Sequence, residues 1–226
     1  MLTRTSDRLC YSADYRAAAI ILLRNGINLF RKSTLVNNIH HAVEIASNPS
    51  ESLAADAMRI VRLSDNSLDY YCAATAFELF AKGLLLNERK VVHIIECRDV
   101  LKPLARQQKS QPVDFDALME IEHAINPNGS DKIISLKDRS LSILAILRSE
   151  MYRREIGFGP EIEAALKPIL RYRNEQAHLF STWAESPLET TQTFALLDTF
   201  VRSRMVPMHN TLARNFGYPN CWLVEA

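Results

Sequence analysis

Apolar residues recur at spacings of three and four along nearly the whole chain, and this is the period of an amphipathic α-helix. The sequence has no alternating run of convincing length that would favour a half-buried strand. Nine prolines and only six glycines also argue against a β-rich fold with many tight turns. We therefore predict an all-α protein. The expected helices span residues 14–32, 34–47, 51–64, 66–87, 98–108, 114–125, 137–155, 160–181 and 188–214.

These helices are expected to form a bundle with an extension and an insertion. With 226 residues, of which 47% are hydrophobic, the chain can bury a core as one large or two small domains. Residues 66–226 contain the bundle, and residues 1–65 form an N-terminal helical extension that packs on it or against a partner. Segment 109–133 is the expected insertion, because Pro112 and the turn at 126–129 interrupt the helical pattern there.

One position in the helix predicted at 160–181 does not suit a buried stripe. Continuing the stripe by one turn places Arg173 where a hydrophobic residue is expected. A guanidinium on the buried side is costly unless it is paired or used. Arg171 lies roughly half a turn away and is expected to be solvated, and Pro168 is expected to kink or restart the helix. The stripe itself consists of Ile162, Ala165, Leu166, Ile169 and Leu170.

Three residue types suited to cutting a phosphodiester follow one another on this helix, namely Arg173, Asn174 and His178. Arginine binds phosphate oxygens with a fork of donors, and histidine exchanges protons near neutral pH. An asparagine can orient the sugar or the imidazole. Because a ribose 2′-hydroxyl is an internal nucleophile, this chemistry needs no metal. The plainer alternative is an ion-paired helix arginine with an exposed surface histidine.

This pattern resembles the signature of the HEPN superfamily, which is an arginine, four to six residues and a histidine, usually with a polar residue directly after the arginine. Arg173, Asn174 and His178 match it residue for residue. Many members also carry Glu-x-x-x-Lys on an early helix, and Glu78 and Lys82 form such a pair in an apolar run. Both features are therefore carried by this chain.

The resemblance covers roughly residues 66–214 and implies an all-helical HEPN-like bundle with additional N-terminal helices and an insertion. It further implies a metal-independent endoribonuclease, used as a toxin or phage-defence effector, that leaves 2′,3′-cyclic phosphate ends. Members typically join two motifs across a two-fold interface, so a homodimer is implied. The partners to expect are RNA and an antitoxin or other regulatory protein. No cofactor is implied.

Glu78 and Lys82 leave two arrangements open. They are one helical turn apart, so they can form an intrahelical ion pair whose lysine extends to solvent. Alternatively, Glu78 reaches across to Arg173 and holds its guanidinium ready for a phosphate. In both arrangements Glu78 supports the site and is not a nucleophile.

Net charge gives no general attraction to nucleic acid, since it is only +1. A local RNA-binding surface is possible if the helices at 137–155 and 160–181 pack antiparallel. Its candidate residues are Arg153, Arg154, Lys167 and Arg171, with Tyr172 as a candidate for stacking on a base. Ordinary solvated charge is the alternative, because glutamates are interspersed among these cations.

The cysteines, the longest early apolar run and the histidines favour a cytoplasmic protein without a metal. The four cysteines have no Cys-x-x-Cys spacing and are expected to be reduced thiols (Cys10, Cys72, Cys97 and Cys221). The apolar run at 17–23 is too short for a signal or a membrane span. Adjacent His40 and His41 point in different directions from a helix, so they make a poor metal pair.

Two other classes of function remain compatible with the sequence. One is a HEPN-like module that binds RNA, a second copy or an antitoxin without cutting. The other is a structural bundle in which Arg173 and Glu78 form only a buried ion pair. In that case, replacing Arg173 by alanine should cost several kcal/mol of stability, since a buried charge would lose its partner.

Overall fold

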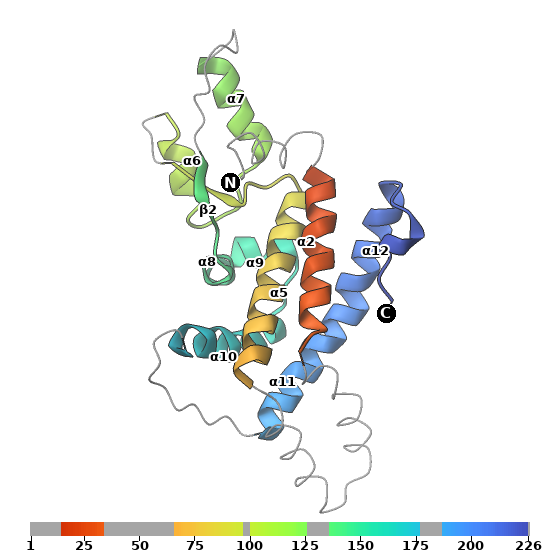
Figure 1. The fold of residues 1–226 in the computed structure, drawn as a ribbon. Helices are drawn as coiled ribbons and strands as arrows, with labels where there is room; N and C mark the ends of the chain where they lie inside the picture. The colour runs from red at the N-terminus through yellow and green to blue at the C-terminus, as the bar shows by residue number, and fades with distance from the viewer. Residues whose placement is uncertain (1–14, 34–65, 97–99, 126–135, 177–186, 226) are drawn as a thin grey trace, which may run out of the picture. The chain divides into compact units, whose positions relative to one another are not determined.

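The computed structural model describes residues 15–33, 66–96, 100–125, 136–176 and 187–225, and within these ranges the chain is predominantly helical (Figure 1). The all-α prediction is therefore confirmed. The helices predicted at 34–47 and 51–64 lie outside the described residues. In the described part of the chain, no helix is both long and apolar enough to cross a bilayer.

The chain divides into two compact units, and both draw on the N-terminal region. The first unit contains residues 1–23 and 80–159, and the second contains residues 24–79 and 160–226. The boundary predicted near residue 65 does not coincide with this division, because helices α2 (Tyr15–Phe30) and α5 (Asn66–Asn87) each contribute to both units.

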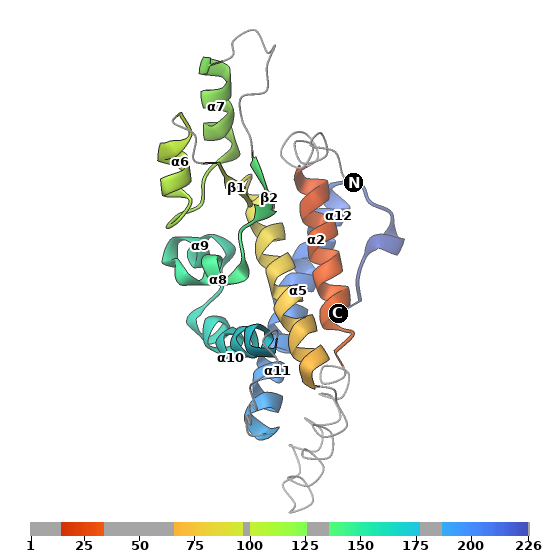
Figure 2. The same ribbon diagram turned by 60° about the vertical axis from the view of Figure 1, so that its left-hand side comes forward.

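Helix α5 is apolar on most sides, as expected of a buried helix, and it lies beside α2 (Figures 1 and 2). Small residues allow α2 to approach it closely. A Cβ atom added at Gly83 would lie 3.1 Å from Cγ of Leu23 and 3.2 Å from the carbonyl oxygen of Ala19. Helix α2 therefore packs directly against α5 at Gly83. The buried side chains of α5 include Asp69, Tyr70, Cys72, Ala73, Ala74, Ala76, Phe77, Phe80, Ala81, Leu84, Leu85 and Leu86.

The first unit contains a two-stranded antiparallel sheet that the sequence analysis did not predict. Strand β1 (His93–Ile95) pairs with β2 (Leu136–Ser140), with Ile95 opposite Leu136. The other edge of β1 is occupied by the side chain of Gln108. Its Oε1 accepts a hydrogen bond from the Ile95 N–H (2.9 Å), and its Nε2 donates to the His93 carbonyl (2.6 Å). A buried amide therefore stands in for a third strand.

The single helix predicted at 137–155 is wrong. Its first residues belong to β2, and the rest forms α8 (Ile143–Arg148) and α9 (Glu150–Ile156). Two serines cause the division, because each caps a new helix start. Ser142 Oγ accepts from the Ala145 N–H (3.2 Å), and Ser149 Oγ accepts from the Tyr152 N–H (3.4 Å).

The other helices of the first unit are α6 (Lys102–Gln107) and α7 (Phe115–Ile125). They correspond to the helices predicted at 98–108 and 114–125, with shorter bounds, and the described part of the predicted insertion at 109–133 belongs to this unit. Lys90 links the end of α5 to this region. Its Nζ lies 2.7 Å from Asp114 Oδ1 and 3.2 Å from Glu155 Oε1.

The second unit contains α10 (Pro160–Gln176), α11 (Pro187–Phe200) and α12 (Val206–Asn215). A π-helical segment, Val201–Met205, joins α11 to α12, so the helix predicted at 188–214 is one continuous run. A short 3₁₀-helix, Asn220–Trp222, follows. The core between α2, α5 and α11 includes two ring contacts of Phe77, at 5.8 Å to Phe30 and 5.9 Å to Phe200.

The C-terminal segment of this unit is held mainly through its main chain. Arg24 donates to the Cys221 carbonyl (3.3 Å) and lies over the Trp222 ring, 4.4 Å from its centroid. Asn210 pairs with both main-chain groups of Val224: its Nδ2 donates to the carbonyl (2.8 Å) and its Oδ1 accepts from the N–H (2.9 Å). Arg31 donates to the Glu225 carbonyl. These contacts fix the segment against α2 and α12.

His209 is fully buried and contacts Asn210, the residue that holds Val224 of this segment. Its Nδ1 is 3.0 Å from Asn210 Oδ1, which is an acceptor, so Nδ1 carries the proton. Its Nε2 is buried and has no hydrogen-bond partner in the described part of the chain. Burial lowers the pKa of His209, the charge of Arg24 lowers it further, and the bond to Asn210 opposes both.

We expect this histidine to make the protein less stable in mild acid. Below its unfolded pKa of about 6.5 the unfolded chain binds a proton that the fold excludes, so the free energy of unfolding falls as the pH drops from there to the folded pKa. Denaturant unfolding of wild type and His209→Gln between pH 8 and pH 5 measures this. The free energy of unfolding should fall less steeply with decreasing pH in the variant than in wild type. An equal fall in the two proteins would contradict the prediction.

Candidate functional site

Helix α10 presents the apolar stripe predicted from the sequence. Pro160 begins the helix, and Glu161 and Glu163 occupy the first turn, where the helix dipole favours negative charge. The helix continues through Pro168, so the proline does not restart it. All five residues predicted for the stripe are buried, namely Ile162, Ala165, Leu166, Ile169 and Leu170. The stripe leads along the helix to Arg173.

Arg173 forms an ion pair with Glu78 of α5. Its Nη1 lies 3.4 Å from Glu78 Oε2, and the two side chains are 20% and 23% exposed. Of the two arrangements open for Glu78, the structure thus contains the one that reaches across to Arg173. A carboxylate partner offsets the desolvation of the guanidinium. The exposed fraction leaves this pair accessible from solvent at its outer side.

Lys82 lies one turn beyond Glu78 on α5 and is half-buried. It belongs to the first unit, whereas Glu78 and Arg173 belong to the second. Its predicted supporting role remains a prediction.

The remaining two candidate catalytic residues are only partly within the described chain. Asn174 continues α10 through its backbone, but its side chain is outside the description. His178 lies outside the described residues. The convergence of Arg173, Asn174 and His178 on one face therefore remains a sequence-based prediction.

Tyr172, the candidate for stacking on a base, packs against another aromatic ring, and its role in RNA binding remains a prediction. The ring is half-buried and lies 4.5 Å from the ring of Tyr70, at an interplanar angle of 33°. The Tyr70 hydroxyl forms a 3.1 Å hydrogen bond with Thr190 Oγ1 on α11, and its ring meets Phe194 edge-on at 5.6 Å. Tyr172 thus packs inside the second unit, because Tyr70 covers one face of its ring.

Tyr70 and Thr190 were missed by the sequence analysis. Both are buried, and each satisfies the hydroxyl of the other across 120 positions of sequence. A tyrosine within the apolar run of α5 was the available signal, because a buried tyrosine hydroxyl needs a polar partner. The identity of that partner depends on how the helices pack.

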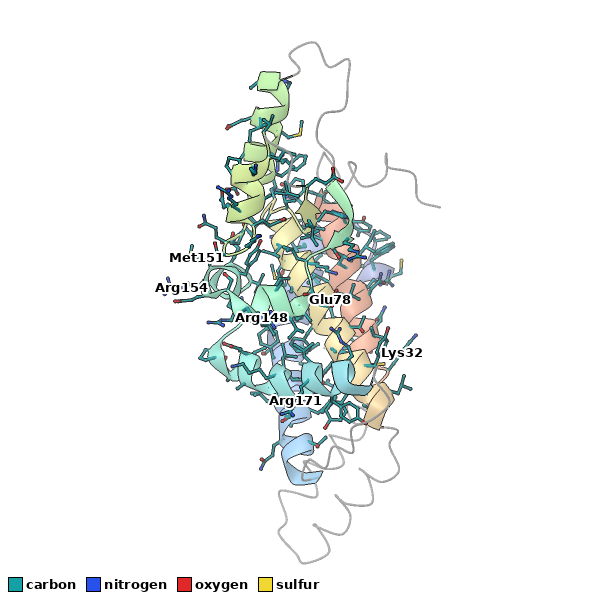
Figure 3. The ribbon with its side chains drawn as sticks, turned by 90° about the vertical axis from the view of Figure 1, so that its left-hand side faces the viewer. Lys32, Glu78, Arg148, Met151, Arg154 and Arg171 are labelled. Carbon is teal, nitrogen blue, oxygen red and sulfur yellow. The ribbon has the colours of Figure 1, made fainter. Side chains whose placement is uncertain are left out.

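The basic residues predicted to bind RNA are divided between the units. Arg171 is exposed on α10 (Figure 3), and Lys167 on the same helix pairs with Glu163 at 3.1 Å. On α9, Arg153 donates to the Leu147 carbonyl (2.6 Å), and Arg154 pairs with Glu150 at 2.6 Å. These contacts support the local helices. Because α9 and α10 lie in different units, a shared RNA-binding surface remains a prediction.

Metal-binding residues do not gather in the described ranges. No group of three or more histidine, cysteine, aspartate or glutamate side chains is placed there to hold an ion. Cys72 and Cys221 are free thiols, the first buried and the second exposed, while Cys10 and Cys97 lie outside the described chain.

Comparison of the chain with protein-family models, with characterised proteins and with solved structures gives no match. The resemblance to the HEPN superfamily therefore rests on the motif residues of the sequence.

The exposure of the Arg173–Glu78 pair predicts a moderate effect on stability. Arg173→Ala should cost about 1 kcal/mol of unfolding free energy, below the 3–5 kcal/mol typical of a fully buried pair that loses one partner. Urea unfolding measures the difference, with exposed Arg214→Ala on α12 as the control. A cost of about 4 kcal/mol would instead favour the purely structural ion pair.

Proposed function

We propose that the protein is a metal-independent endoribonuclease of the HEPN type. One contact carries the proposal. The Arg173–Glu78 ion pair joins the two features of the resemblance, which are 95 positions apart in the sequence. One feature lies on the early helix α5 and the other on the late helix α10. A shared site requires that they be in contact.

In the proposed reaction, the ribose 2′-oxygen attacks the adjacent phosphorus and the bond from phosphorus to the 5′-oxygen breaks. His178 takes the proton from the 2′-hydroxyl as general base, and a second His178 or water returns a proton to the leaving 5′-oxygen. Arg173 stabilises the charge that develops on the phosphorane, while Asn174 positions the scissile group. The products carry a 2′,3′-cyclic phosphate and a 5′-hydroxyl.

Glu78 would act on this reaction through Arg173. A guanidinium presents its donors in a rigid plane, so a carboxylate on one side leaves the remaining donors oriented for a phosphate. The separation of 3.4 Å between Arg173 Nη1 and Glu78 Oε2 is long for a charged hydrogen bond. A partner at this distance orients the guanidinium while leaving it able to shift toward the substrate.

We further propose that two copies complete the site. On an ideal helix His178 lies about 140° around the axis from Arg173, so one copy directs the histidine away from the buried stripe. An isologous dimer would then line one cleft with both histidines. By resemblance, such a protein acts in the cytoplasm as a toxin or phage-defence effector, held in check by an antitoxin or another regulator.

The deciding experiment incubates wild type and His178→Ala with labelled total RNA in EDTA and identifies the ends of the fragments. Cleavage by wild type only, with cyclic-phosphate ends, supports the proposal. Equal background from both proteins would favour the non-cutting module, which binds RNA, a second copy or a regulatory partner. Cleavage by both proteins well above background would remove His178 from the role of general base, once a contaminating nuclease has been excluded with a mock-purified sample.

A further inference from the structure

The end of α10 that carries Arg173 contacts α5 at two separate points. Tyr172 meets Tyr70, and the next residue, Arg173, meets Glu78. Tyr70 and Glu78 are eight residues apart on α5, which corresponds to about 12 Å along the helix axis. Both contacts lie within the second unit, where α10 crosses the N-terminal half of α5 (Figures 1 and 2).

Two such contacts, beyond the buried stripe, fix the rotation of the last turn of α10 about the helix axis. Consecutive side chains leave an α-helix about 100° apart, so Tyr172 and Arg173 point in clearly different directions. With one held near the start of α5 and the other two turns further along, α10 cannot turn without breaking a contact. If the Tyr172 contact is lost, the last turn of α10, which follows the buried stripe, can shift and pull the ion pair apart.

Tyr70 is itself held firmly enough to serve as such an anchor. Its side chain is 4% exposed, its hydroxyl bonds to Thr190, and the edge of its ring contacts Phe194. Both partners are on α11 and are buried. The ring therefore stands between α10 and α11, and its aromatic face determines where Tyr172 lies.

We propose that Tyr70 is a positioning residue for Arg173: by holding Tyr172, it sets the rotation of α10 at which Arg173 meets Glu78. The consequence for RNA cleavage rests on the proposed function, but the effect on the ion pair does not. The ring is the important part of the side chain, because it contacts Tyr172. The hydroxyl contributes by tying the ring to Thr190.

A double-mutant cycle on Glu78→Ala and Arg173→Ala measures the ion pair directly by urea unfolding. In wild type, the coupling should change the folding equilibrium constant by about fivefold. In a Tyr70→Leu background, which keeps apolar volume but loses the flat ring, the coupling should nearly vanish. In a Tyr70→Phe background, which keeps the ring, it should remain close to the wild-type value. Unchanged coupling in Tyr70→Leu would overturn the proposal.

Phe30→Ala is the matched control for general loosening of the core. Phe30 is a fully buried ring in the same unit and packs on Phe77, which is not part of α10. This variant should lose stability yet keep the Glu78–Arg173 coupling. If the coupling disappears in Phe30→Ala as well, Tyr70 has no special role.

Cleavage assays provide the second readout. Tyr70→Leu should lower kcat by about 10- to 100-fold, because a misplaced guanidinium no longer meets the phosphorane, while KM changes by less than about threefold. Tyr70→Phe should restore most of kcat. If wild type cuts no RNA, the proposed function fails but the cycle still decides whether Tyr70 positions Arg173. A normal kcat in a Tyr70→Leu protein that has lost the coupling would separate the ion pair from catalysis.

Discussion

Cleavage of RNA by His178→Ala is expected to be about 10²–10⁴ times slower than cleavage by wild type. The proposed base must accept a proton from a hydroxyl that is otherwise a poor nucleophile, and alanine offers no acceptor. The wild-type rate should also rise through about pH 6–7, where a histidine becomes neutral, and this rise should disappear in the variant. Single-turnover rates between pH 5 and pH 8 measure both effects.

His123→Ala is the matched control for this experiment, since His123 is an exposed histidine on α7 of the first unit. It should cut RNA at the wild-type rate. A loss of less than about tenfold in His178→Ala would remove His178 from the role of general base. Arg173 and Glu78 would then be part of a phosphate-binding site, and a residue other than His178 would accept the proton.

Phe77→Ala is expected to lower the free energy of unfolding by about 3–5 kcal/mol. The ring is fully buried and contacts Phe30 on one side and Phe200 on the other. Removing it opens a cavity where three helices meet, and the rigid aromatic neighbours cannot fill it. Urea unfolding followed by circular dichroism gives the change, and the m-value should remain constant if the folded state is otherwise intact.

Tyr71→Ala is the control that distinguishes the loss of a buried ring from the loss of any aromatic ring. Tyr71 is on the same helix as Phe77 and is 54% exposed. This variant should change stability by less than about 0.5 kcal/mol. Equal losses from the two variants would mean that Phe77 is not at the centre of the second unit.

The long helices were predictable because each carries its own signal. Helix α5 spans the predicted range of 66–87, and α10 begins at the predicted Pro160 with the predicted buried stripe. In both cases, the period of apolar residues over several turns outweighs local exceptions such as Pro168. Information of this kind is local, so one sequence is enough to read it.

The errors arose where distant residues or single polar side chains decide the structure. Strand β2 forms because β1 offers it a partner some forty residues earlier, and no local period indicates that pairing. Ser142 and Ser149 then divide the expected helix by capping two shorter ones. Capping by serine competes with helix continuation, and which of the two prevails depends on the packing of each short helix.

The candidate site was predictable in its residues but not in its contacts. Because Arg173 is a charged residue on an apolar stripe, the sequence indicated that it needs a partner. Glu78 was a candidate, since it could pair either with Lys82 or with Arg173. The sequence could not choose between them, because the choice depends on how α10 crosses α5. Tyr172 shows the same limitation, since its contact with Tyr70 depends on that crossing.

The π-helical segment at 201–205 should affect how the sequence of this protein aligns with those of homologues. The buried residues in this part of the chain include a series spaced by four, at Leu197, Val201, Met205, His209 and Ala213, with Phe194, Asp198 and Val206 buried beside it. In a regular α-helix each such step overshoots a full turn by about 40°, so the buried face would drift away from the core. The wider π turn absorbs part of that drift, as a single inserted residue would. Homologues with a regular helix here should therefore align with a one-residue gap inside 201–205, leaving the buried positions on both sides in register.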